Sequence, residues 1–229
     1  MIGIGRNSGK RLTVRMMSNT HFQDATARMV RILSLLDALA AAGLTPSSNR
    51  ALHELAYLAN VLAPVFDLTS LDAVLLKRKS GPYYPELQQT IDSLVGRGLV
   101  EALEPRYEMD EIEQRYRMIV SYRLRRSAVT PALDRYRVLY ESEAHFLDEL
   151  AAAYSALTDE EQGYAALRDA RYADASVDVD NVIDFGQWVD MKENFSRNAA
   201  MAFAPDENLL PAERLYMYLD YLQQKVVHG

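Results

Sequence analysis

Apolar side chains recur at spacings of three and four residues from position 20 onwards, which is the period of an α-helix. The first such stripe consists of Phe22, Ala25, Met29, Ile32, Leu36 and Leu39. Thr20 and Gln23 have the spacing of a capping box at its start, and Gly43 ends it. A second stripe predicts a helix from about Ser48 to Leu62, with Leu52, Leu55, Leu58 and Leu62 on one face.

A third helix is predicted within RKSGPYYPELQQTIDSLVGRGLVEAL, residues 78–103. Pro85 stands at its first position, where the missing N–H costs nothing. Leu87, Ile91 and Leu94 face inward, and the Gly-x-Gly at 96–98 ends the helix. Before it, residues 67–82 predict a short helical turn followed by a basic loop. After it, LVEAL is typical of a strand.

Apolar residues occupy every second position in RYRMIVSYRLR, residues 115–125, and the positions between them are polar except for Ile119. This period of two predicts a strand with one apolar face and one largely basic face. The segment EPRYEMDEIEQ, residues 104–114, then joins two strands as a loop. Three helices, a strand, a loop and a strand follow the order of a winged helix-turn-helix, so residues 20–128 are predicted to form a winged-helix domain.

Residues 129–229 are predicted to form a helical C-terminal region. Thr130-Pro131 opens a helix that lasts to about Leu157, and Thr158 with Glu161 makes a capping box for the next. Residues 176–186 predict a loop with a little extended structure, and helices follow at about 186–203 and 211–227. The fold class expected is mainly α with a small β-hairpin.

The N-terminal 19 residues hold four basic residues and no acid, and no apolar stretch follows them. They are expected to form a flexible basic tail and not a signal peptide, and translation starts at Met1 or at Met16 or Met17. No apolar run approaches the roughly 18 residues that span a bilayer. No membrane association and a cytoplasmic location are therefore expected.

Charge is unevenly distributed along the chain. Residues 1–150 have a balance of +1 and residues 151–229 a balance of −8, within a net charge of −7. The acidic C-terminal third is an unfavourable surface for nucleic acid but a possible one for a basic partner. The absence of cysteine excludes disulfides, thiolate nucleophiles and Cys-ligated metals.

The sequence contains no complete catalytic or metal-binding motif. The glycines at 5 and 9 are too close for a phosphate loop, and no Gly-x-Ser-x-Gly elbow occurs. His53 has Tyr57 where a zinc protease needs a second histidine. The acidic run Asp178–Asp184 lacks the glycine of a calcium loop. The sequence predicts no enzyme, catalytic residue, metal or cofactor.

The third helix lacks Lys and Arg before Arg97, and the following loop is acidic, which disfavours a reader of DNA bases. A protein-docking role is the preferred alternative, with candidate contacts at Tyr83, Tyr84, Glu86, Gln88, Gln89, Tyr216, Tyr218 and Tyr221. Basic residues gather elsewhere and form either a DNA-backbone surface, a contact for an acidic subunit or a solvated face. They are Lys77, Arg78, Lys79, Arg115, Arg117, Arg123, Arg125 and Arg126.

The segments ARMVRILSLLDAL, ALHELAYLANVLAPVF and KRKSGPYYPELQQTIDSLVGRGLVE resemble the middle component of ABC-three-component systems, which include Lamassu-type anti-phage defence operons. The resemblance covers about residues 22–125. It implies a non-enzymatic subunit that bridges a structural-maintenance-of-chromosomes (SMC)-like ATPase and an effector, often a nuclease. Double-stranded phage or plasmid DNA would be the trigger and would be contacted by the whole complex.

Two alternatives remain open from the sequence. The winged-helix pattern also fits a DNA-binding transcriptional regulator. A related Gly-Pro-x-x-Pro-Glu-Leu signature, here at residues 81–87, also resembles Panacea-type antitoxins. The resemblance carries no catalytic residues onto this chain.

Overall fold

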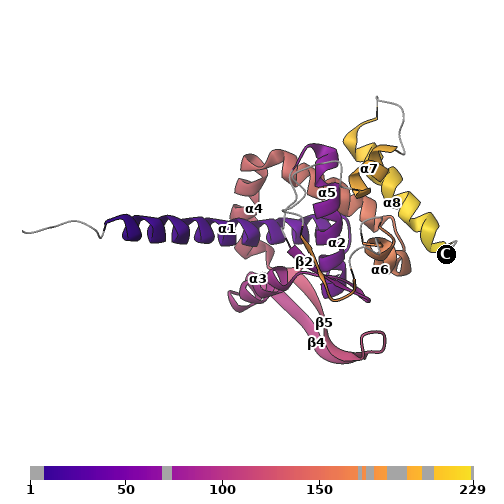
Figure 1. Cartoon of the computed structure of the whole chain (residues 1–229), viewed down its shortest axis with the longest axis horizontal. Helices are drawn as coiled ribbons and strands as arrows, with labels where there is room; N and C mark the ends of the chain where they lie inside the picture. The colour runs from indigo at the N-terminus through magenta and orange to yellow at the C-terminus, as the bar shows by residue number, and fades with distance from the viewer. Residues whose placement is uncertain are drawn as a thin grey trace, which may run out of the picture.

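The computed structural model describes residues 8–68, 74–169, 172–173, 178–184, 195–202 and 209–227. Over these residues the protein is mainly helical, with two small antiparallel sheets of three strands each. Figure 1 shows a helical body from which the first helix and a long β-hairpin extend in different directions. The mainly helical fold class predicted from the sequence is confirmed at this level.

Helix α1 spans Ser8–Ala41 and is the longest element described. It begins well before Thr20, so residues 8–19 belong to a helix and not to the flexible tail expected from the sequence. The segment after Gly9 contains neither Gly nor Pro to interrupt the helix. The C-terminal end was predicted correctly, because Gly43 has a φ of 84° and the N–H of Leu44 donates to the carbonyl of Leu39.

Helix α2 spans Asn49–Leu62 and begins where the sequence predicts. The hydroxyl of Ser48 accepts a 3.0 Å hydrogen bond from the N–H of Ala51 and so caps the helix. All residues from Leu52 to Leu62 are buried, so the helix is enclosed on every side and not along one stripe. A short 3-10 helix, η1 (Ala63–Phe66), continues it through Pro64.

Helix α3 spans Pro85–Gly96, and its predicted inward residues Leu87, Ile91 and Leu94 are all buried. Pro85 occupies the first helical position, as expected. Gly98 has a φ of 72° just after the helix, a left-handed conformation that a side chain would strain.

The first sheet has the strand order β1-β5-β4. It consists of β1 (Ser47–Ser48), β5 (Arg115–Leu124) and β4 (Val100–Asp110). Most of the loop predicted at 104–114 is therefore strand. The register between β4 and β5 shifts between Leu103 and Arg106, and Glu104 has a φ of 50° there, so the strand carries a β-bulge.

The second sheet has the order β3-β2-β6, and it was not predicted. It joins β3 (Gly81–Tyr83), β2 (Val74–Arg78) and β6 (Val182–Asp184). Residues 74–78, expected in a helical turn and a basic loop, thus form its central strand. The partner strand β6 lies about a hundred residues away, in the segment for which a little extended structure was expected.

Two helices replace the single one expected from Thr130 to Leu157. They are α4 (Arg126–Leu139) and α5 (Glu141–Ser155), and the chain breaks at Tyr140, with a φ of −129° and a ψ of 50°. Across this corner the Arg137 guanidinium binds the Asp148 carboxylate at 2.6 Å. This ion pair joins two separate helices. The spacing of apolar residues along the segment therefore did not reveal the break at Tyr140.

Three further helices close the structure. Helix α6 (Asp159–Arg168) starts with the predicted capping box of Thr158 and Glu161. Helix α7 (Phe195–Ala202) is the described part of the helix expected at 186–203, whose earlier residues lie outside the described ranges. Helix α8 (Pro211–Val227) agrees with the prediction.

One hydrophobic core extends through both predicted regions. It contains Leu39, Leu58 and Tyr122 from before residue 128, together with Phe146 and Leu219 from after it. Since β6 also pairs with β2, the described part of the C-terminal region completes the structure of the N-terminal one.

Candidate functional site

The β4–β5 hairpin presents two chemically different faces beyond the bulge at Glu104. Tyr107 pairs with Met118, and Met109 pairs with Tyr116, so these four side chains lie on one face. Without the extra residue of the bulge, β4 would present Arg106 and Glu108 on this face instead. The bulge thus makes the outer half of the hairpin apolar on the same side as the buried inner half.

The inner and outer halves of this apolar face have different surroundings. Val120 and Tyr122 on β5 are buried in the core, with exposed fractions of 3% and 1%. Tyr107 and Tyr116 are exposed to 71% and 69%, and Met109 to 49%. We call Tyr107, Met109 and Tyr116 the hairpin apolar patch. It lies on the part of the hairpin that leaves the helical body in Figure 1.

The opposite face of the hairpin carries the predicted basic residues, but they are paired with acids. Arg117 lies 3.3 Å from the Asp110 carboxylate, and Arg115 forms an ion pair with Glu113. Asp110 also accepts hydrogen bonds from the N–H groups of Ile112 and Glu113, which closes the turn at the end of the hairpin. Asp110 and Glu113, two of the acids of the predicted loop, are therefore structural groups.

The arginines nearer the body are also neutralised. Glu101 on β4 binds Arg123 at 2.7 Å and Arg125 at 3.3 Å, and Arg126 lies 2.6 Å from Asp37 on α1. The Arg123 hydrogen bonds lower the pKa of Glu101, so this acid stays ionised at neutral pH. Each of the arginines Arg115, Arg117 and Arg123 of β5 therefore has a carboxylate partner within the chain.

The three basic residues that precede α3 have different environments. Lys77 is buried, and its ammonium lies 5.7 Å from the ring centroid of Tyr172. Lys79 is exposed in the β2–β3 turn. Arg78 is half-buried with its guanidinium over the ring of Tyr83, 3.9 Å from the centroid. Of the three, only Lys79 is presented to solvent as the sequence suggested.

The predicted docking residues of α3 are partly unavailable to a partner. Tyr84 and Gln88 are buried, and the Gln88 amide donates hydrogen bonds to the Asp92 carboxylate and the Tyr122 hydroxyl. Glu86 is exposed but pairs with Arg28 of α1 at 2.5 Å. Tyr84 and Gln88 thus have little surface to offer a partner in this structure.

Tyr83 and Gln89 complete the docking candidates at the start of α3. Gln89 is exposed, and Tyr83 is half-buried between Arg78 and the ring of His53, whose centroid lies 4.9 Å away. The Tyr83 ring is therefore packed between other side chains and does not protrude from the surface.

The three candidate tyrosines of α8 also separate into inner and outer positions. Tyr218 is fully buried, Tyr221 is half-buried and packs on the core, and Tyr216 is 41% exposed. The dense apolar composition of this helix mostly reflects core packing. Only Tyr216 remains as a surface residue of the three.

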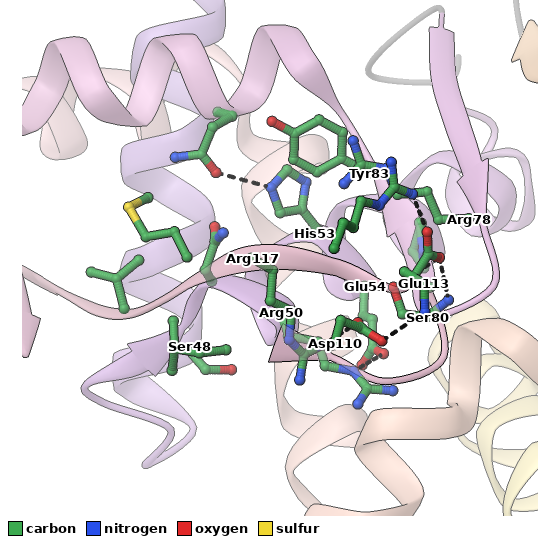
Figure 2. Close-up of a pocket in the computed structure, with 18 of the residues that line it drawn as sticks. Ser48, Arg50, His53, Glu54, Arg78, Ser80, Tyr83, Asp110, Glu113 and Arg117 are labelled. Atoms are coloured by element: carbon green, nitrogen blue, oxygen red, sulfur yellow. Dashed lines mark hydrogen bonds and ion pairs between the residues drawn. The ribbon is translucent and has the colours of Figure 1, made fainter. Parts of the chain in front are cut away.

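A cavity of about 280 Å³ lies between the N-terminus of α2, the β2–β3 turn and the hairpin. Figure 2 shows His53 and Tyr83 side by side on one wall, with Arg78, Ser80 and Glu113 near one another at one end. The turn is held against the hairpin because the N–H of Ser80 donates a 3.0 Å hydrogen bond to Glu113. The cavity is thus formed by segments far apart in the sequence.

Two buried titratable groups of α2 line this cavity. The N–H of Tyr84 donates to Nδ1 of His53 at 3.1 Å, so Nε2 carries the proton and faces Gln88 at 3.3 Å. Burial lowers the pKa of His53 to about 4. Burial also raises the pKa of the neighbouring Glu54 to about 7, although Arg50 binds it at 3.0 Å.

Sequence reasoning missed His53 and Glu54 as members of a site. Both stand within HELAYLAN, where polar residues interrupt an otherwise apolar helix. That interruption is a detectable signal, since polar residues in a helix buried on all sides need partners. Arg50 is a local partner of Glu54, but the other partners are Gln88 of α3 and Tyr154 of α5, which the local sequence does not reveal.

The described residues contain no group of three or more His, Asp or Glu placed to hold a metal ion. None of the described helices is both long enough and apolar enough to cross a membrane. Comparison with models of protein families, with curated proteins and with solved structures finds no match to this chain.

Proposed function

We propose that the protein is a non-catalytic adaptor subunit that docks on a protein partner through the outer half of its β4–β5 hairpin. The element order and the β1-β5-β4 pairing support a winged-helix arrangement, in which this hairpin is the wing. In this arrangement α3 takes the place of the recognition helix.

The hairpin apolar patch is the observation that carries the proposal. Tyr107, Met109 and Tyr116 continue a buried apolar face into solvent, and the two tyrosines are each about 70% exposed. Exposed tyrosines and methionines grouped on one surface are typical of protein interfaces. Since the bulge at Glu104 places them together, the patch depends on a specific backbone feature and not on chance exposure.

Recognition of DNA bases by α3 is less well supported than docking on a protein. Two of the polar side chains of α3 are engaged, Gln88 inside the molecule and Glu86 with α1. The arginines of the hairpin are paired with carboxylates, which reduces the positive potential that a phosphate backbone would require. A protein-docking winged helix fits both observations better than a sequence-specific transcriptional regulator.

The partner follows from the resemblance to the middle components of ABC-three-component systems. It is an SMC-like ATPase, with an effector, often a nuclease, on the other side of the adaptor. Such an assembly would act in the cytoplasm against phage or plasmid DNA. In this proposal the chain itself supplies contacts and no chemistry.

Co-expression with the products of the adjacent genes tests the proposal. We expect a stable complex with a coiled-coil ATPase, and we expect the double variant Tyr107→Ser/Tyr116→Ser to lose it. The matched control is Val138→Ser on α4, which changes an exposed apolar residue at a distant position. Retention of the complex by the double variant would remove the hairpin from the interface.

Three other experimental outcomes would indicate a different function for the protein. Co-purification with a small toxin in place of an ATPase would indicate a Panacea-type antitoxin. Selection of one tight palindromic DNA motif would indicate a transcriptional regulator. Nuclease, ATPase or hydrolase activity of the pure chain, abolished by one point mutation, would show that it is an enzyme.

A further inference from the structure

We propose that the cavity between α2, the β2–β3 turn and the hairpin binds a small phosphate-bearing anion, with Arg78 as its central contact. This site shares Tyr116 with the hairpin apolar patch, but its central contact, Arg78, lies outside the patch and its binding of an anion does not depend on the adaptor function. The ligand class is a phosphate monoester of up to about the size of a mononucleotide.

Arg78 is the first reason for the proposal. Its guanidinium is held flat on the Tyr83 ring at 3.9 Å, and its Nε is buried with no hydrogen-bond partner. In the described part of the chain, no carboxylate lies within ion-pair distance of it. Glu113 and Asp180 attract it only from beyond ion-pair distance, so a bound anion would supply the direct contact that this half-buried cation lacks.

The neighbouring arginines form the second reason. Burial lowers the pKa of Arg78, and the nearby Arg115 lowers it further, against the opposing effects of Tyr83, Glu113 and Asp180. Arg117 also has a buried Nε with no partner, although its outer nitrogen pairs with Asp110. Two of the guanidinium groups that line the cavity thus have a buried Nε without a hydrogen-bond partner.

The charge balance of the cavity selects the ligand class. Four guanidinium groups and three carboxylates line it, and one of these acids is Glu54, whose pKa is about 7. The cavity thus has a surplus of one positive charge when Glu54 is ionised and two when it is protonated. A phosphate monoester carries about −1.5 to −2 charges at pH 7, which matches this surplus better than a single carboxylate.

The remaining lining supports an anion with a polar organic part. Ser48 and Asn49, at the N-terminus of α2, also line the cavity, and the positive end of a helix dipole favours an anion. The Asn49 Oδ1 is buried without a hydrogen-bond partner and would accept from a ligand hydroxyl. The volume of about 280 Å³ equals that of roughly nine waters, enough for a small phosphorylated molecule.

Isothermal titration calorimetry on the full chain, at constant ionic strength, tests the site with inorganic phosphate and with adenosine monophosphate as probes. We expect binding that Arg78→Gln weakens about tenfold or more, since it removes charge-assisted hydrogen bonds. Lys79→Gln is the matched control, because it removes the same charge from the exposed neighbouring position. Equal affinity for both probes would mean that the site recognises the phosphate group alone. Tighter binding of adenosine monophosphate would mean that it also recognises the nucleoside.

Amide chemical-shift changes in the wild-type chain on phosphate titration give a second measurement that does not depend on a variant folding. We expect them at Asn49, Arg50, Ser80, Gly81 and Tyr83, which border the cavity. The proposal is overturned if neither probe binds at millimolar concentration, if Arg78→Gln binds like the wild type, or if the shifts map elsewhere.

Discussion

The hydroxyl of Tyr218 on α8 donates a 2.5 Å hydrogen bond to the carboxylate of Asp169, which directly follows α6. The other oxygen of Asp169 accepts from Ser196 on α7 at 2.8 Å and from the hydroxyl of Tyr57 on α2. Asp169 is fully buried, so these hydroxyls replace the water that a carboxylate otherwise binds. One carboxylate thereby joins α2, α6, α7 and α8.

Removal of one donor from this network should destabilise the protein. We expect Tyr218→Phe to lower the free energy of unfolding by about 1–3 kcal/mol, because it leaves a buried carboxylate with one hydrogen bond fewer. The control is Tyr216→Phe on the same helix, where the ring is 41% exposed and the change should stay within about 0.5 kcal/mol. Urea unfolding measures both, and equal effects would contradict the structural role of Asp169.

Loss of the whole of α8 should be far more severe. Leu215, Tyr218, Leu219 and Leu222 are buried in the core shared with the N-terminal region. Each contributes about 1.5–3 kcal/mol by burial, and together they approach the total stability of a typical domain. We expect a chain truncated after Leu210 to show no cooperative unfolding transition. A cooperative transition near that of the full chain would mean that α8 is a dispensable docking element.

The hairpin should tolerate polar substitution at its outer end but not at its inner end. We expect Tyr107→Ser/Tyr116→Ser to change the free energy of unfolding of the isolated chain by no more than about 0.5–1 kcal/mol. Tyr122→Ala, on the same face but buried, should cost about 3–5 kcal/mol. Thermal or urea unfolding measures both. A large loss from the double variant would mean that the patch supports the fold, which would weaken its assignment to a partner.

Glu101 should restrain binding to DNA. We expect Glu101→Gln to release Arg123 and Arg125, and therefore to increase the sequence-independent affinity for duplex DNA. Each additional phosphate that the protein neutralises should steepen the plot of log affinity against log salt concentration by about 0.9. Fluorescence anisotropy over a salt series measures this.

Glu104→Gln is the control for this change, because it removes the same charge from an exposed position on the same strand. An equal increase in affinity in both variants would indicate only the change in net charge. An unchanged slope in Glu101→Gln would leave these arginines as a solvated or protein-contacting face.

The stability of the protein should respond to pH through two opposing groups of α2. The pKa of Glu54 is raised from 4.5 to about 7, so its protonated form stabilises the fold below about pH 4.5, and this contribution is lost as pH rises through 7. The pKa of His53 is lowered from 6.5 to about 4, so its neutral form stabilises the fold above pH 6.5, and this contribution is lost as pH falls through 4. Between about pH 4.5 and 6.5 the two effects have opposite signs.

Substitution of one group should reveal the effect of the other. We expect Glu54→Gln, relative to wild type, to become more stable by up to about 3 kcal/mol as pH rises from 4.5 to 7, because the glutamine has no proton to lose. The variant His53→Asn should show the opposite trend, with its relative stability highest at low pH. Urea unfolding at several pH values measures both, and parallel profiles for all three proteins would contradict the assigned burial.

Several local features were predictable because both interacting groups lie within a few residues of each other. Ser48 begins α2, Pro85 begins α3, Thr158 and Glu161 cap α6, and Gly43 ends α1. Capping and turn formation depend on side chains and backbone groups separated by three to five positions. The sequence by itself therefore determined where these helices begin and end, and it determined the alternating pattern of β5.

The candidate sites depended on tertiary contacts that no local pattern contains. Arg123 is neutralised by Glu101, 22 positions away, and the basic segment at 74–78 becomes a strand because β6 pairs with it from about a hundred residues further along the chain. The bulge at Glu104, and not the alternation in β5 alone, decides which β4 side chains lie beside Tyr116. Only the tertiary structure decided which charges are paired and which aromatic rings remain exposed, because pairing and burial depend on segments brought together by folding.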